Sequence, residues 1–293
     1  MSRSTVWLID AHYQIFRAYY SMPDLRSSDG SPVGAVRGYA ATLIRFLTRQ
    51  APTHVAAAFD HALTSFRNEI YPPYKQGRTE APEGLEPQFS LCMAVTEGLG
   101  VTCYELEDYE ADDVIATLCD RLVEQGADVM IVSPDKDLST LVSKHVSMFD
   151  LKNEEACGPE GVKARMGVPP ELVEDYLTLV GDSVDNIPGV KGIGPKTASA
   201  LLNRFGSLDS IPPSVEHWTN IELRGAAKMA ERLAQATREI ELSRELVHMH
   251  RDLPLPVRID GLRWNGARRS ELEELFEHLG IGSLLERVPR FGG

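Results

Sequence analysis

The sequence has little cysteine and no long apolar run. Four cysteines are spread through 293 residues, and no two of them are close enough for a Cys-x-x-Cys pair: Cys92, Cys103, Cys119 and Cys157. This excludes a disulfide-stapled scaffold and favours buried thiols in a reducing compartment. No apolar run approaches the roughly 20 residues of a membrane span. The N-terminus, MSRSTVWLIDAHYQ, meets charge after a short apolar run and is not typical of a signal peptide. We therefore expect a cytoplasmic protein without a membrane partner.

The chain is also short of basic residues. It has 30 Lys plus Arg against 43 Asp plus Glu, which gives a formal net charge of −13. Proteins that bind phosphate backbones are usually basic, so the bulk charge argues against a nucleic-acid partner. The 43% of hydrophobic residues suffices for a sizeable core, and the 25% of charged residues is ordinary for a globular protein. The composition excludes a disordered chain, and the length predicts about two domains.

Short apolar runs alternate with helical patterns in the first half of the chain. The pattern predicts strands at 6–9, 54–59, 101–104, 128–132 and 146–149, and helices at 38–48, 87–99 and 110–124. This alternation predicts an α/β fold with a mostly parallel sheet flanked by helices. Uninterrupted apolar runs such as VWLI and VMIV fit strands that are buried on both faces.

The strand signal fades after about residue 168. Patterns at 172–180, 195–204, 221–233 and 271–279 predict helices. We therefore expect an α/β domain over 1–170 and a helical domain over 171–293. Residues 61–86 hold three prolines and two glycines and break the pattern of the first domain. A connection of this length is typical of a functional lid.

Acidic residues follow the predicted strands. Asp10, Asp60 and Asp135 each come after an apolar run. One such Asp is more often a helix cap or a turn former. However, the carboxyl ends of parallel strands meet at the edge of the sheet where ligands bind. Three carboxylates are therefore expected to face one crevice.

Further carboxylates extend this group. Glu110, Asp112 and Asp113 open a helix, Asp137 follows Asp135, and LVGDSVDNIP contributes Asp182 and Asp185. Like charges held this close repel unless a cation neutralises them. An all-oxygen set suits Mg²⁺ or Mn²⁺ rather than Zn²⁺. Two such ions about 4 Å apart stabilise the attacking and leaving oxygens of a phosphoryl displacement.

A glycine-rich element lies at 189–198, GVKGIGPKTA. It is not a P-loop, because Pro195 separates Gly194 from Lys196, and it lacks the Rossmann glycine spacing. A turn that leads into a helix at Pro195 presents backbone N–H groups to a phosphate. A plain tight turn is the simpler alternative. We favour a helix–hairpin–helix over 186–205 that contacts DNA backbone, through Gly189, Lys191, Gly192, Gly194, Lys196 and Thr197.

Six stretches carry a family resemblance: LIDAHYQIFRAYY, PTHVAAAFD, FRNEIYPPYKQGR, YEADDVIATL, SPDKDLSTLV and LVGDSVDNIPGVKGIGPKTA. The chain resembles the 5′ nucleases, a family of 5′→3′ exonucleases and flap endonucleases that includes the N-terminal domain of bacterial DNA polymerase I. The resemblance implies a PIN-like sheet domain and a helical domain with the helix–hairpin–helix. It implies that all nine carboxylates bind metal, with two Mg²⁺ or Mn²⁺ ions, and that the glycine turn can hold K⁺.

The resemblance also assigns basic and aromatic residues. Residues 61–86 match an arch over the single-stranded 5′ end, where Lys75 and Arg78 contact the scissile phosphate. Arg17, next to Tyr19, matches the segment below the arch. Tyr74 can stack on a base or pack in the core. Because 293 residues leave no room for a polymerase, we expect a stand-alone nuclease or a chain cut to one domain.

These observations predict a monomeric, Mg²⁺-dependent 5′→3′ exonuclease and flap endonuclease that cuts DNA near single- and double-strand junctions in replication or repair. Two alternatives stay open: a structure-specific DNA-binding protein without cleavage, and a PIN-type ribonuclease. A haloacid-dehalogenase phosphatase is excluded, because that class needs Asp-x-Asp after the first strand and this chain has Asp10-Ala11-His12.

Overall fold

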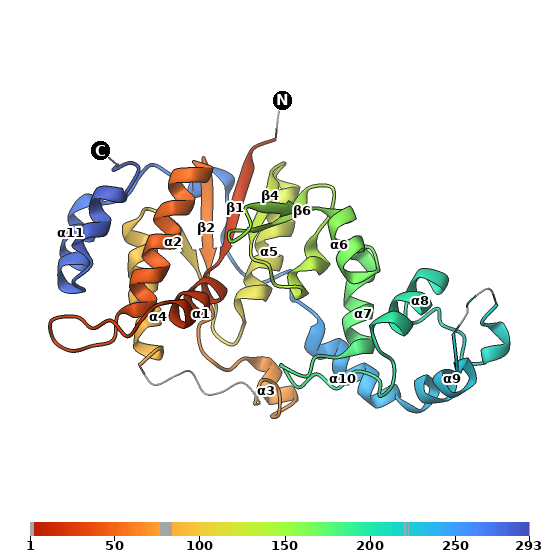
Figure 1. Ribbon diagram of the computed structural model, residues 1–293. Helices are drawn as coiled ribbons and strands as arrows, with labels where there is room; N and C mark the ends of the chain where they lie inside the picture. Colours follow the sequence, from red (N-terminus) through yellow and green to blue (C-terminus); the bar gives the residue numbers. More distant parts are fainter. Residues whose placement is uncertain (1–2, 77–83, 220, 222, 293) are drawn as a thin grey trace.

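A six-stranded sheet lies at the centre of the computed structural model, which describes residues 3–76, 84–219, 221 and 223–292 (Figure 1). Its spatial order is β3-β2-β1-β4-β5-β6. The first five strands pair in parallel, and β6 pairs antiparallel to β5. The strands are β1 (Thr5–Asp10), β2 (His54–Ala58), β3 (Thr102–Tyr104), β4 (Asp128–Val132), β5 (Val146–Asp150) and β6 (Glu155–Cys157). The predicted α/β class with a mostly parallel sheet is confirmed.

Helices cover both faces of the sheet (Figure 1). Those of the sheet domain are α1 (Ala11–Ser21), α2 (Gly34–Gln50), α3 (Phe66–Ile70), α4 (Glu86–Gly98), α5 (Ala111–Glu124) and α6 (Pro159–Met166). The later helices are α7 (Val173–Val180), α8 (Pro195–Phe205), α9 (Ala226–Gln235), α10 (Thr237–Val247) and α11 (Arg269–His278). Short 3₁₀ turns lie at η1 (Asp137–Leu141), η2 (Pro170–Leu172), η3 (Val215–His217), η4 (Ile259–Leu262) and η5 (Gly282–Arg287).

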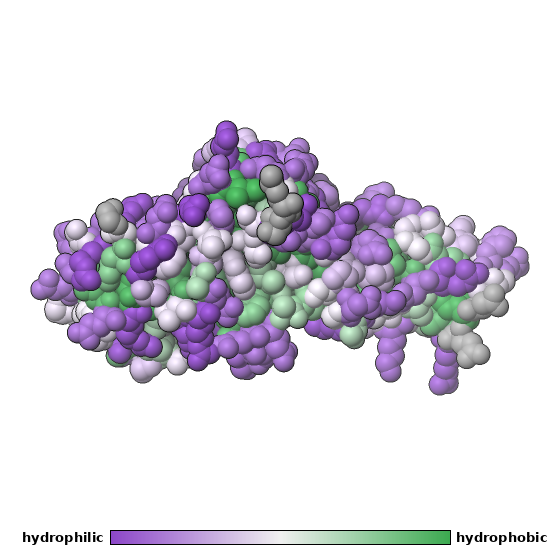
Figure 2. All heavy atoms as spheres, turned by 90° about the horizontal axis from the view of Figure 1, so that it is seen from above, coloured by the Kyte–Doolittle hydropathy of each residue, from purple (hydrophilic) through white to green (hydrophobic). Residues whose placement is uncertain are grey.

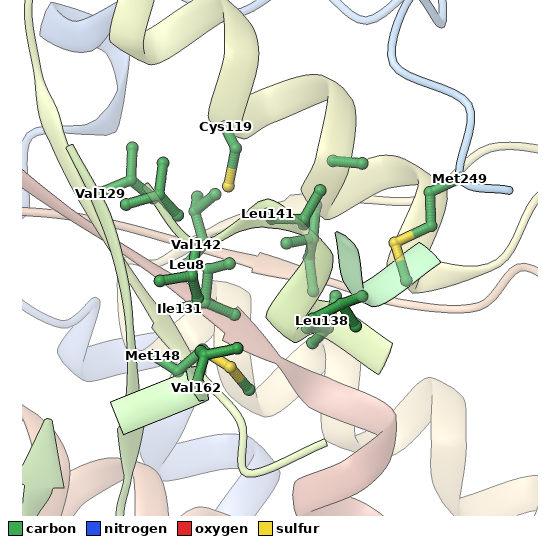
Figure 3. Close-up of a cluster of buried hydrophobic side chains, with 14 of the residues drawn as sticks. Leu8, Cys119, Val129, Ile131, Leu138, Leu141, Val142, Met148, Val162 and Met249 are labelled. Carbon is green, nitrogen blue, oxygen red and sulfur yellow. The ribbon is translucent and has the colours of Figure 1, made fainter. Parts of the chain in front are cut away.

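The strands bury apolar side chains on both faces, as their uninterrupted apolar runs require. Leu8 and Ile131 point to one face, where they pack with Leu138 and Leu141 of η1 (Figure 3). Met249, from the segment after α10, joins the same cluster. The core of the sheet domain therefore includes residues from beyond the predicted boundary.

The C-terminal segment returns to the sheet domain. The indole N–H of Trp264 donates to the carbonyl of Leu99 at 2.8 Å. The backbone N–H of Arg268 donates to Gly98 at 2.8 Å, and the Leu272 side chain lies against Gly98. Helix α11 therefore packs on α4, at the opposite end of the molecule from α8 and α9 (Figure 1). This corrects the expectation that 171–293 form one helical unit, because α11 packs on the sheet domain, away from α8 and α9.

One face of the molecule carries little continuous apolar area. Figure 2 shows a mostly hydrophilic face, with hydrophobic residues visible in small areas between polar ones. Among the described helices, none is long and apolar enough to span a membrane.

Candidate metal centre and nucleic-acid interface

A cavity of about 230 Å³ lies at the carboxyl edge of the sheet. Strand β1 ends in it, and the segments after β2, β3 and β4 meet there, because parallel strands end on the same side. The turn after α7, the segment from α3 to Lys75 and the end of α10 form the other walls. Eight of the nine predicted carboxylates line it: Asp10, Asp60, Glu110, Asp112, Asp135, Asp137, Asp182 and Asp185.

Asp10 connects β1 to α1. Its Oδ1 caps α1 by accepting from the backbone N–H of Tyr13 at 3.0 Å, and its Oδ2 accepts from the Ser133 hydroxyl at 2.8 Å. Asp60 follows the end of β2, and its side chain is also held by a helix. Its Oδ1 accepts from the backbone N–H of Ala111, at the start of α5, at 2.6 Å. These two contacts fix both carboxylates against the first turns of α1 and α5.

Glu110 is the most heavily bonded carboxylate of the cavity. Its Oε1 accepts from the Ser65 hydroxyl at 3.1 Å and from Lys75 Nζ at 3.0 Å. Its Oε2 accepts from the Tyr74 hydroxyl at 3.2 Å and from the guanidinium of Arg67 at 3.4 Å. Burial acts to raise the pKa of Glu110, but Lys75 and Arg67 outweigh it and lower this pKa. Glu110 is therefore a fixed anion.

Three other carboxylates lack such compensation. Burial, followed by repulsion from Asp135, raises the pKa of Asp137 to about 7 and that of Asp112 well above its ordinary value. Burial also raises the pKa of Asp10 to about 7, although its hydrogen bonds oppose this. Asp137 Oδ1 is buried and accepts no hydrogen bond from the described residues. The cavity thus concentrates negative charge that its own cations do not balance.

This donor set fits hard divalent cations. It consists of carboxylate oxygens, which Mg²⁺ and Mn²⁺ prefer, and Asp137 offers a buried oxygen with no other use. Among the described residues, no three His, Cys, Asp or Glu side chains already converge into a closed metal cluster. The carboxylates are instead spread over the cavity wall, which suits Mg²⁺, an ion that usually keeps several of its waters.

Asp113 departs from the prediction of nine metal ligands. It is fully buried, and both oxygens accept from the guanidinium of Arg67, at 2.7 and 2.9 Å. Oδ1 also accepts from the N–H of His250 and Oδ2 from the N–H of Glu110. Because α5 turns Asp113 away from Asp112, it does not line the cavity, and its oxygens are already occupied. It is an ion-pair partner, not a ligand.

The turn at 182–187 docks on the base of the predicted arch. Lys75 donates its backbone N–H to the carbonyl of Asp185 at 3.0 Å, and the Asn186 amide donates to Pro73 at 2.8 Å. Lys75 and Asn186 both have positive φ, 56° and 58°, which non-glycine residues rarely adopt. Lys136 pairs with Asp182 on the other side of the turn. The helical unit and the arch base therefore meet at the cavity.

The predicted basic residues have different outcomes. Lys75 lines the cavity, and its ammonium group donates a hydrogen bond to Glu110. Arg78 lies outside the described residues. Arg17 does not line the acidic cavity and contributes to a separate cleft on the other side of α1. The structure thus places Arg17 outside the acidic cavity, and its contact with the reacting phosphate stays a prediction.

The two tyrosines predicted to contact DNA also have different outcomes. Tyr74 is only 4% exposed and uses its hydroxyl on Glu110, so it packs inside the protein and offers no face to a base. Tyr19 is half-buried and packs edge-on against the exposed Tyr20, with ring centroids 5.3 Å apart. Of the two, Tyr19 alone stays a prediction for DNA contact.

The glycine turn has an inner and an outer part. Gly189 is buried, and its N–H donates to the Ser243 hydroxyl at 3.0 Å. It is therefore not available for the DNA contact that the sequence predicted. Gly192 and Gly194 lie outside it, and their N–H groups donate to no described group. Lys191 and Lys196 are exposed, and Thr197 is half-buried beside them at the start of α8. The outer part keeps the N–H groups and charges that a phosphate needs.

Substitution of Gly189 tests this division. Its φ is +57°, and a Cβ there would lie 2.5 Å from the backbone of Gly181. We expect Gly189→Ala to lower the free energy of unfolding by about 2–4 kcal/mol, from left-handed strain and overpacking. Gly194→Ala is the matched control, because φ is −98° and nothing lies within 4 Å of its Cβ position. Urea denaturation followed by circular dichroism measures both; equal stabilities would contradict the packing role of Gly189.

Sequence reasoning missed side chains that hold the cavity carboxylates in place. Arg67 and Ser65 donate to Glu110, and Ser133 donates to Asp10. Arg67 stands in the same stretch, FRNEIYPPYKQGR, that contains Lys75. The burial of Arg67 is what distinguishes it from the other arginines, and the sequence alone does not show which arginines are buried.

Comparisons with known proteins agree with this geometry. Residues 5–167 match the family described as 5′-3′ exonuclease, N-terminal resolvase-like domain, and residues 168–270 match its C-terminal SAM fold. The chain is 33% identical to the 5′-3′ exonuclease of Aquifex aeolicus over 287 residues, 98% of this chain and 96% of that one. It is 37% identical to DNA polymerase I of Bacillus caldotenax over 285 residues, 96% of this chain. It spans only 32% of that polymerase.

A solved structure shares the fold. The bacteriophage T5 flap endonuclease, in a pseudo-enzyme–product complex with DNA and metal ions, superposes with a TM-score of 0.65 at 18% identity, covering 97% of this chain and 99% of that one. The sheet, the acidic cavity and the helical unit thus define an α/β nuclease. The chain belongs to the 5′-3′ exonuclease family.

Proposed function

We propose that this chain is a Mg²⁺-dependent 5′→3′ exonuclease and 5′-flap endonuclease that cuts DNA near single- and double-strand junctions, in replication or repair. The observation that carries the proposal is the gathering of eight carboxylates and Lys75 around one cavity. The exonuclease named among its relatives, and the DNA and metal ions of the T5 complex, support it.

The residues of the cavity divide the work. Asp10, Asp60, Glu110, Asp112, Asp135 and Asp137 would hold the divalent ions directly, and Asp182 and Asp185 directly or through water. Two such ions would supply an activated water and neutralise the charge on the leaving 3′ oxygen. Lys75 lies 3.0 Å from Glu110 and is placed to exchange this contact for a scissile phosphate. Arg78 stays a proposed second contact to the same phosphate.

The glycine turn would hold the duplex. Lys191 and Lys196 are exposed beside the available N–H groups of Gly192 and Gly194, so the backbone of one duplex arm can bind there without being read in sequence. The same proposal includes a K⁺ ion that would be bound by backbone carbonyl oxygens of this turn. The protein would act as a monomer.

Cleavage of an end-labelled 5′-flap DNA tests the proposal. We expect Mg²⁺-dependent products that map to the junction, and K⁺ to affect binding rather than the position of cleavage. An RNA flap in competition reports the sugar preference. Binding without any cleavage across a Mg²⁺ and Mn²⁺ titration would contradict nuclease activity.

Lys75→Ala tests the basic residue of the cavity. We expect kcat to fall about 10²–10³-fold, because a charge that stabilises the transition state is lost. The dissociation constant for flap DNA in EDTA should change by less. Lys144→Ala, at an exposed lysine away from the cavity, is the control and should keep full activity. An unchanged kcat in Lys75→Ala would remove Lys75 from the reaction.

A further inference from the structure

The backbone of Lys75 adopts an uncommon conformation. Its φ is +56°, in the left-handed region that residues other than glycine rarely enter. The backbone N–H of Gln76 donates to the carbonyl of Pro73 at 3.0 Å, so Lys75 is the third residue of a tight turn. A positive φ at this position of a turn is usually supplied by glycine. The conformation therefore depends on neighbouring groups that hold the turn in place.

The loop at 182–187 supplies two such contacts. The carbonyl of Asp185 accepts the backbone N–H of Lys75 at 3.0 Å. The side-chain amide of Asn186 donates to the carbonyl of Pro73 at 2.8 Å. Figure 1 shows how the segment between α7 and α8 reaches α3, which precedes this turn. Two neighbouring residues of the loop thus fix the first and third residues of the Lys75 turn.

The amide of Asn186 is not needed to shape its own loop. Asp182 and Ile187 close that loop through two backbone hydrogen bonds, at 2.8 and 2.9 Å. Within the described part of the chain, the Asn186 side chain makes no hydrogen bond other than the one to Pro73. Its φ of +58° would be adopted more easily by glycine. An amide at this position is therefore explained by its contact with Pro73.

The turn brings the Lys75 ammonium to the acidic cavity. Its Nζ lies 3.0 Å from Oε1 of Glu110. The amide of Asn68, from α3, also supports the turn by donating to the carbonyl of Tyr74 at 3.0 Å. That contact lies within the same segment as Lys75, whereas the contact from Asn186 joins the turn to a different wall of the cavity.

We propose that Asn186 is a positioning residue for the reaction. Its amide holds the carbonyl of Pro73, and the turn then keeps the Lys75 ammonium at the place where the scissile phosphate reacts. Asn186 itself touches neither the phosphate nor a metal ion in this scheme. The proposal rests on the proposed function, because it takes Lys75 as a group that acts on that phosphate.

Asn186→Gly tests the role of the amide, because glycine keeps the left-handed backbone and removes only the side chain. We expect kcat on 5′-flap DNA to fall about 10–10²-fold, since a small displacement of a reacting group costs this much. The dissociation constant for the same DNA in EDTA should stay unchanged. Asn153→Gly is the matched control: it loses an amide hydrogen bond to Asp150, 2.7 Å long, in a turn that does not line the cavity. This control should keep the wild-type kcat.

Combination with Lys75→Ala separates positioning from a general structural effect. If Asn186 acts through Lys75, then Asn186→Gly should cause no further loss of kcat in a protein that already carries Lys75→Ala. Losses that multiply would overturn the proposal, because the amide would then act on another part of the cavity. An unchanged kcat in Asn186→Gly alone would overturn it as well.

Hydrogen exchange of the protein without DNA gives a readout that does not depend on cleavage. The peptide that contains residues 71–76 should exchange faster in Asn186→Gly than in the wild type or in Asn153→Gly, because the turn is released from the loop. Unchanged exchange in an enzyme that cuts flap DNA would overturn the positioning role and leave the proposed function intact. Faster exchange in a protein that cuts nothing would contradict the proposed function and leave the contact between Asn186 and the turn intact.

Discussion

Asp112→Asn will abolish cleavage of 5′-flap DNA, by about a thousandfold or more, while binding in EDTA stays measurable. The reason is that Asp112 is buried beside Asp135 and Asp10, where its charge is sustained only by a cation. The neutral Asn keeps the shape of the side chain and removes that attraction. A product assay with Mg²⁺ measures the loss directly.

Thermal unfolding gives this variant a second readout that does not depend on activity. Saturating Mg²⁺ should stabilise the wild type by RT ln(1 + [L]/Kd), about 2.7 kcal/mol at 100 times Kd, and Asp112→Asn should lose most of this gain. Asp120→Asn, on the same helix but paired at the surface with Arg251, is the matched control. Full Mg²⁺-dependent cleavage by Asp112→Asn would end the assignment of Asp112 to the metal centre.

Arg67→Ala will lower the free energy of unfolding by about 3–5 kcal/mol, since it leaves Asp113 charged and buried without its partner. Arg67 also donates to the carbonyls of Leu246 and His248, so the end of α10 loses its anchor to α3. We expect the melting temperature to fall by roughly 10 °C. Differential scanning calorimetry at one fixed pH measures it.

The controls for Arg67 separate a buried pair from an exposed one. Arg49→Ala removes a surface ion pair with Glu154 and should cost at most about 1 kcal/mol. Arg67→Met/Asp113→Asn should recover part of the loss, because no buried charge is left unpaired. Asp113→Asn alone should keep the Mg²⁺-dependent stabilisation. Loss of that stabilisation would show that Asp113 is a ligand after all.

The positions of the carboxylates could be predicted because one rule covers most of them. Asp10, Asp60 and Asp135 follow parallel strands, and all parallel strands of a sheet end at one edge. The turn that holds Asp182 and Asp185 was recognised by its motif, and the structure brings it to the same cavity. Strand positions and the α/β class followed from apolar runs that both faces of the sheet bury.

What could not be predicted depends on which way a side chain points. Asp112 and Asp113 are neighbours on α5, about 100° apart around its axis, so one faces the cavity and the other Arg67. Tyr74 and Lys75 are adjacent too, yet only tertiary packing decides that Tyr74 is buried. Gly189 and Gly194 look alike in the motif, but only Gly189 has another backbone against it.

The return of the C-terminal segment to α4 affects how the chain reaches its folded state. Trp264, Leu272 and Phe276 complete a core cluster whose other members include Val55 and Val95. These contacts link residues separated by more than 150 positions, so closing them carries the loop-closure entropy of a long segment. During synthesis, α2 and α4 are available to this cluster early, whereas Trp264, Leu272 and Phe276 join it only after α7 to α10 have been made. The helices α7 to α10 thus lie between two parts of the sequence that share one hydrophobic cluster, and this cluster is complete only after those helices have been made.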